Sequence, residues 1–155
     1  MTVSTDDRVL ASEPVADWLA LPSTPAAAGL ARSFVTSWLV VAESDVVDVA
    51  VLLTSELVTN AVLYGAAPIR LQLHRRPGTV RIEVHDQGLA FRPPAEAGWS
   101  LTDEGGRGLP LLDALATSWG SQSSRSIAGK TLWFELTGDQ LDAPLEDPAR
   151  THRRT

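Results

Sequence analysis

The stretch TSELVTNAVLYG, residues Thr54 to Gly65, carries most of the information on the fold. Placed on a helix of about 3.6 residues per turn, its apolar residues extend a narrow stripe that we expect to face a sheet. The full stripe consists of Val46, Ala50, Leu53, Leu57, Ala61 and Tyr64. Glu56 and Asn60 lie about 40° apart on one flank of it. They can point together into a cavity at the edge of the core, or they can be half-solvated boundary residues.

The composition limits the class of protein. A chain of 155 residues, 44% of them hydrophobic, is long enough for one domain with its own core. A net charge of -6 argues against a general nucleic-acid binder. There is no cysteine, and the three histidines show no metal-ligand spacing. The sequence has neither a signal peptide nor an apolar run of about 18 residues, so we expect a cytoplasmic protein without a membrane segment.

The order of predicted elements indicates an α/β two-layer sandwich. In chain order they are a strand at 17–23, helices at 24–42 and 44–64, a hairpin at 69–76 and 80–86, a helix at 107–120 and then one or two strands, including a closing strand at 130–136. We expect the helices on one face of a mixed, mainly antiparallel sheet. The domain should cover residues 16–137, between disordered tails at 1–15 and 138–155. The irregular run 89–106 is long enough to be a functional loop or lid.

Two predictions concern individual helices. The helix at 44–64 should end with Gly65 as its C-cap. In the helix at 24–42, the apolar residues Leu30, Phe34, Trp38 and Val41 recur at helical spacing, so we expect them to face the core. Phe34 and Trp38 could instead form an interaction or dimer surface.

A second motif follows the predicted hairpin. In VHDQG, residues 84–88, Asp86 leaves a strand and is followed two residues later by Gly88. An aspartate in this place can accept a hydrogen bond from an exocyclic amine, and the glycine permits close approach of a flat ring. Taken alone, the motif also fits a simple turn.

A third motif, EGGRGLPLL at 104–112, opens the next predicted helix. Gly105, Gly106 and Gly108 place bare backbone N–H groups at the start of that helix, where the helix dipole favours phosphate. Arg107 adds a cation, and Pro110 must lie in the first turn. Taken alone, this motif also fits a flexible loop.

Taken in this order, and followed by GKT at 129–131, the motifs resemble the ATP-binding domain of the GHKL superfamily, which includes gyrase and the sensor histidine kinases. The resemblance is greatest to the small single-domain anti-sigma factors that are also serine protein kinases. It covers roughly Trp18 to Leu136 and implies a Bergerat-type fold that binds ATP and Mg²⁺. The Walker pattern G-x-x-x-x-G-K-[ST] is absent from the sequence.

The resemblance also implies roles for the first two motifs. SELVTNAV matches the family's N-box, in which Asn60 would coordinate Mg²⁺ and Glu56 would act as general base. DQG matches the first glycine box, in which Asp86 would accept from the adenine amino group and Gly88 would line the ring.

The remaining matches concern the phosphates and the closing strand. GGRGL matches the second glycine box, so Gly106, Arg107, Gly108 and Leu109 would contact the nucleotide, with phosphate contacts from the two glycines. GKT matches the last box, with Thr131 near adenine. The chain departs from the pattern at Ala90, where a second glycine is usual, and after the N-box, where Leu63 and Tyr64 replace a basic or histidine residue.

Three functions are compatible with these motifs. The first is an ATP-binding anti-sigma factor that binds a sigma factor and phosphorylates a serine of an anti-sigma antagonist, without binding nucleic acid or membrane. The second is a non-catalytic ATP-sensing adaptor. The third, a detached sensor-kinase domain, ranks lowest because no predicted helix carries a phosphoacceptor histidine. Whether the protein forms a homodimer stays open.

Overall fold

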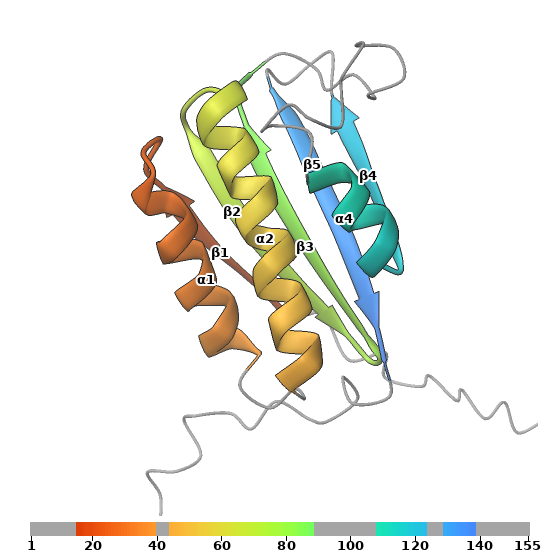
Figure 1. Ribbon diagram of the computed structural model, residues 1–155. Helices are drawn as coiled ribbons and strands as arrows, with labels where there is room; N and C mark the ends of the chain where they lie inside the picture. The colour runs from red at the N-terminus through yellow and green to blue at the C-terminus, as the bar shows by residue number, and fades with distance from the viewer. Residues whose placement is uncertain (1–14, 40–43, 89–107, 124–128, 139–155) are drawn as a thin grey trace, which may run out of the picture.

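The computed structural model describes residues 15–39, 44–88, 108–123 and 129–138 (Figure 1). Its elements are β1 (Val15–Leu21), α1 (Ala26–Trp38), α2 (Ser44–Tyr64), β2 (Ile69–Arg76), β3 (Thr79–Asp86), α4 (Gly108–Leu115), β4 (Ser118–Ser123) and β5 (Lys130–Thr137). The predicted lid lies outside the described residues. So do the predicted tails, apart from Val15 in β1 and Gly138, whose N–H donates to the carbonyl of Gly78.

Five strands form one sheet in the order β1-β2-β3-β5-β4. All four neighbouring pairs are antiparallel, so the described sheet is antiparallel throughout rather than mixed. The three described helices cover one face of it, with α1 over β1, α2 over β2 and β3, and α4 over β5 and β4 (Figure 1). This arrangement confirms the predicted two-layer α/β sandwich.

The hairpin of β2 and β3 follows the predicted alternation of apolar and polar residues. In both strands every second residue is buried beneath the helices. Pro77 and Gly78 form the turn, and the φ of 70° at Gly78 lies in the left-handed region that glycine adopts without strain. Proline followed by a glycine of positive φ is the residue pair of a type II turn.

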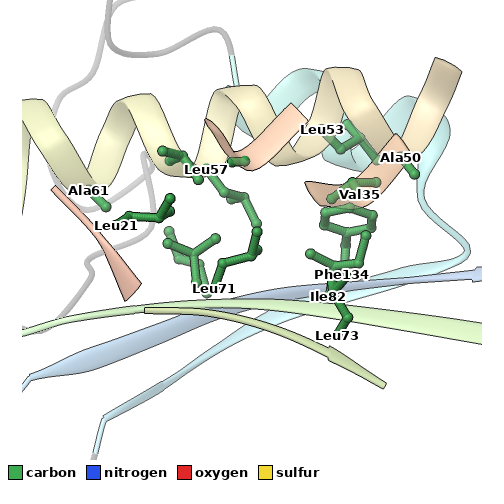
Figure 2. Close-up of a cluster of buried hydrophobic side chains, with 14 of the residues drawn as sticks. Leu21, Val35, Ala50, Leu53, Leu57, Ala61, Leu71, Leu73, Ile82 and Phe134 are labelled. Atoms are coloured by element: carbon green, nitrogen blue, oxygen red, sulfur yellow. The ribbon is translucent and has the colours of Figure 1, made fainter. Parts of the chain in front are cut away.

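The core lies between α2 and the sheet (Figure 2). Ala50, Leu53, Leu57 and Ala61 are buried as predicted, and Val46 packs partly buried against them. Tyr64, by contrast, is 56% exposed. The next residue, Gly65, lies against Asp86, the last residue of β3. The last turn of α2 therefore lies at the end of β3. The prediction that Tyr64 faces the sheet is wrong.

The face that α1 turns to the core differs from the predicted one. The buried residues are Ala27, Ala31, Val35 and Leu39. Phe34 and Trp38 pack partly buried at the margin of the core, while Leu30 is 49% exposed. Small alanines on the inner face let α1 approach α2 and β1 closely, and this displaces the bulky residues to the flank. Val41 lies outside the described residues.

The prediction that the last helix extends to Gly120 is wrong. Helix α4 ends at Leu115, and Ser118–Ser123 forms β4, paired with β5 at the edge of the sheet. The indole N–H of Trp119 in β4 donates to the Asp113 carboxylate of α4 at 2.6 Å, which joins the two elements. Pro110 lies in the first turn of α4, as predicted.

Helix α2 is also apolar as a whole. Residues Asp45–Tyr64 have a mean hydropathy of 1.7, so by length and composition this helix is able to cross a membrane. The core helix of a soluble protein meets the same criteria. Here the buried stripe of α2 packs on the sheet.

Candidate functional site

The ends of α2 and β3 and the start of β5, which carry predicted motifs, lie at one end of the sandwich. Strand β3 ends there at Asp86, and Lys130 starts β5 directly opposite. The N–H of Gln87, just after β3, donates to the carbonyl of Ala66, just after α2, at 2.8 Å. The C-terminal ends of α2 and β3 are therefore joined at the same end of the sandwich (Figure 1).

The Asp86 carboxylate is the polar centre of this end. The residue is only 2% exposed. Its Oδ1 accepts a hydrogen bond of 2.6 Å from the N–H of Gly88 and one of 3.2 Å from Nζ of Lys130. A longer contact of 3.4 Å comes from the N–H of Ala66. Because a buried carboxylate needs donors to offset its lost hydration, these groups fix the position of Asp86.

Three glycines leave room for Asp86. A Cβ on Gly65 would lie 2.5 Å from the Asp86 Cγ, and one on Gly88 would lie 2.7 Å from Oδ1. A Cβ on Gly129 would lie 2.2 Å from the Asp86 carbonyl oxygen, and the φ of 108° at Gly129 also favours glycine. Among the described glycines, φ is positive at Gly78 and Gly129 but not at Gly65. Close packing on Asp86, rather than a left-handed helix cap, therefore explains the glycine at position 65.

Glu56 and Asn60 lie on the flank of α2 that faces away from α1. Ser55 marks the α1 side, because its hydroxyl lies 3.3 Å from Nη1 of Arg32 in α1. The next residue, Glu56, is turned by about 100° and falls on the other flank, and Asn60 follows one turn later. Both side chains are half-buried. Helix α4 packs against α2 on this side (Figure 1).

The start of α4 points toward the same end of the molecule. Ser118 at the start of β4 pairs with Glu135 at the far end of β5, and Ser123 pairs with Lys130. Since α4 ends just before β4 begins, its C-terminus lies at the far end and its N-terminus faces the end where Asp86 lies. Gly108 and Leu109 open this helix, while Gly106 and Arg107 lie outside the described residues.

The structure does not bring Thr131 together with Asp86. Successive side chains of a strand point to opposite faces, and the Thr131 hydroxyl lies 2.9 Å from Nδ1 of His85 on the face without helices. Lys130 points to the helix side instead. The alternation of KTLWFEL predicts this orientation, because a register that buries Leu132 also turns Lys130 inward.

The described residues contain no group of three or more histidine, cysteine, aspartate or glutamate side chains that could hold a metal ion. A hollow of about 410 Å³ lies on the open face of the sheet beside Arg81, Glu83 and Glu135. Arg81 forms an ion pair with each of the two carboxylates, at 2.6 Å from Glu83 and 3.2 Å from Glu135. None of the predicted site residues lines this hollow.

Comparison with known proteins agrees with the arrangement of the motifs. Residues 21–136 match the family model of the histidine kinase-like ATPase domain. The match covers most of the chain, so the protein belongs to this family, and membership implies a nucleotide site.

A similar solved structure contains the RsbU and RsbW domains of Rv1364c from Mycobacterium tuberculosis. It aligns with a TM-score of 0.57 at 22% sequence identity, over 78% of this chain and 31% of that one. The likeness shows a shared fold, and the present chain spans less than a third of that protein. No curated protein matches the sequence significantly.

Proposed function

We propose that this chain is an ATP-binding anti-sigma regulatory factor with serine protein kinase activity, which binds a sigma factor and phosphorylates an anti-sigma antagonist. One observation carries the proposal: the buried Asp86 carboxylate and the N-terminus of α4 lie at the same end of the sheet, and Glu56 and Asn60 lie on the flank of α2 against which α4 packs. Membership of the ATPase-domain family and the fold shared with a structure that holds an RsbW domain support it.

The Asp86 end of the site suits a purine base. A buried carboxylate accepts hydrogen bonds, and the exocyclic amine of adenine is a donor. Gly88 has no side chain beside this carboxylate, so the face of a flat ring can approach the backbone there.

The α4 end suits the phosphates. Unpaired N–H groups in the first turn of a helix attract negative charge, and Gly108 opens that turn. The amide oxygen of Asn60 is a hard ligand that would hold Mg²⁺ together with phosphate oxygens, without adding negative charge. When bound, Mg²⁺ neutralises charge on the phosphates.

Glu56 would then serve the transfer step. As the serine oxygen bonds to the γ-phosphorus, the bond from that phosphorus to the ADP oxygen breaks, and Glu56 takes the serine proton. Glu56 and Asn60 are one helical turn apart on the same flank, so the proton acceptor and the metal ligand lie side by side.

The test is phosphoryl transfer from Mg·ATP to a purified candidate antagonist, detected as phosphoserine by mass spectrometry. We expect Glu56→Gln to keep ATP binding and to slow transfer about 100-fold or more, the typical contribution of a positioned base. Asp48→Asn, an exposed carboxylate on the same helix, is the matched control and should transfer at the wild-type rate. A Glu56→Gln rate equal to that of wild type would remove Glu56 from the mechanism.

The second candidate function is an ATP-sensing adaptor that does not transfer phosphate. The observation that favours it is the pair Leu63 and Tyr64, 61% and 56% exposed on the last turn of α2, one turn after Asn60. Exposed apolar side chains beside a nucleotide site can contact a protein partner whose binding depends on the nucleotide. Saturable ATP binding without transfer to any antagonist would support this adaptor.

A further inference from the structure

Lys130 is the only lysine in the sequence, and it is buried at the start of β5. Its side chain is 10% exposed and that of Asp86 is 3% exposed, and the ammonium lies 3.2 Å from Asp86 Oδ1. Lysine is almost never buried without a partner. The contact is thus an ion pair inside the candidate base site.

The ammonium also occupies the space beside Gly88. A Cβ on Gly88 would lie 3.1 Å from Nζ of Lys130 and 2.7 Å from Asp86 Oδ1. The side chain of Lys130 therefore reaches across the glycine that, in the proposed function, lies against the purine ring. Ring and ammonium cannot both occupy this space.

The hydrogen bonds of Asp86 lead to the same conclusion. Oδ1 already accepts from the N–H of Gly88 and from Lys130, with Ala66 at longer range. A carboxylate oxygen has about two lone-pair sites, so these donors saturate it. An incoming amine that is to use this oxygen must displace one of them, and the lysine side chain is the one that can swing away, whereas Gly88 and Ala66 donate from the backbone.

We propose that Lys130 occupies, in the nucleotide-free chain, the place of the purine's exocyclic amine, and that its displacement sets the affinity for the base. This inference rests on the proposed ATP site. Binding of the base then exchanges a buried ion pair for a hydrogen bond from a neutral amine, which is the weaker contact. The position after Gly129 thus determines how strongly the chain holds purine nucleotides.

The first test is a calorimetric titration of wild type and Lys130→Thr with ATP and with inorganic tripolyphosphate, both in Mg²⁺. We expect Lys130→Thr to bind ATP about tenfold more tightly, because no ammonium has to leave the carboxylate. Tripolyphosphate affinity should not change, since it has no base. The matched control is Arg76→Thr, which removes a basic side chain from an exposed position on β2 and should leave both affinities unchanged.

Equal or weaker ATP binding by folded Lys130→Thr, with wild type binding ATP, would overturn this inference and leave the proposed function standing. Absence of ATP binding in wild type and in the variant, both folded, would overturn the proposed function and this inference with it.

A second test needs no substitution. Acetic anhydride acylates exposed amines, and mass spectrometry can follow Lys130 alone because the chain has no other lysine. We expect slow acylation of Lys130 in the free protein and at least about tenfold faster acylation at saturating ATP, as the side chain moves into solvent. An unchanged or slower rate in ATP-saturated protein would overturn the inference.

Discussion

The Asp86 carboxylate accepts hydrogen bonds from three separate segments of the chain. Gly88 follows β3, Ala66 follows α2 and Lys130 begins β5. A single buried acceptor thus joins the ends of three elements. Substitutions at Asp86 will therefore affect both ligand recognition and local structure, and the two effects have to be measured separately.

Asp86→Asn should weaken ATP binding by about 1–3 kcal/mol, the range for losing a hydrogen bond to a buried polar group. The variant keeps the shape of the side chain but loses an acceptor and the charge opposite Lys130. Calorimetry gives the affinity, and circular dichroism checks that the chain is folded. Asp17→Asn, exposed on β1, should bind ATP as wild type does. If Asp86→Asn also matches wild type, Asp86 does not recognise the base.

Asn60→Ala should remove the Mg²⁺ dependence of ATP binding. Asn60 is the only residue of the proposed site whose amide oxygen is assigned to the metal, and alanine offers no ligand there. ATP titrations at several Mg²⁺ concentrations measure the effect. A dependence on Mg²⁺ identical to that of wild type would mean that the metal is held elsewhere.

Some residues of the site were predictable from the sequence and others were not. Asp86 and Gly88 form a short local motif. They lie at the same end of the sandwich as the C-terminus of α2 and the N-terminus of α4. The contribution of Gly65 could not be predicted locally. A glycine is needed at this position because the Asp86 side chain, 21 positions further along the chain, packs against it. The contact of Lys130 with Asp86 was not predicted, because the resemblance assigned a role to Thr131. Strand alternation turns the Lys130 side chain inward and that of Thr131 to the open face.

Among the elements, the C-terminal end of α2 is closely packed against the end of β3. A Cβ on Gly65 would lie 2.5 Å from the Ala61 carbonyl oxygen and 2.5 Å from the Asp86 Cγ. Neither the helix backbone nor the base of a buried carboxylate can move away easily. The last turn of α2 and the end of β3 therefore depend on this glycine.

Gly65→Ala should lower the free energy of unfolding by about 1–3 kcal/mol, the usual cost of overpacking. Gly29→Ala, in the first turn of α1, is the matched control. Its Cβ would meet only the end of the Arg32 side chain at 3.6 Å, so alanine should stabilise the helix by about 0.5–1 kcal/mol. Urea denaturation measures both. A Gly65→Ala variant that is as stable as wild type, or more stable, would contradict the packing described around Gly65.

The strength of the sequence signal differs between elements. The β2–β3 hairpin and α2 were predicted with nearly the observed bounds, because clear alternation or a long apolar period marks them. The first half of strand β4, residues 118–120, was taken for helix because SWGSQS is polar and contains a glycine, so at the sheet edge it shows little alternation. The inner face of α1 was misassigned because Ala27 and Ala31 carry less apolar surface than Leu30 and Phe34.

In the whole molecule, the two faces of the sheet differ in polarity. The open face of the sheet is polar, with guanidinium groups over two indole rings: Arg70 lies 4.2 Å from the Trp18 ring and Arg81 lies 3.9 Å from that of Trp133. The helix face holds the apolar core. The candidate site lies at one end of that core, so the buried Asp86 carboxylate lies beside apolar side chains.

The proposed function requires that the end of the sandwich around Asp86 binds ATP. Its most direct test is calorimetric titration of the purified protein with ATP, in the presence and absence of Mg²⁺. We expect saturable binding near one site per chain that is stronger with Mg²⁺. The absence of binding heat at high ATP, from protein shown to be folded, would contradict it.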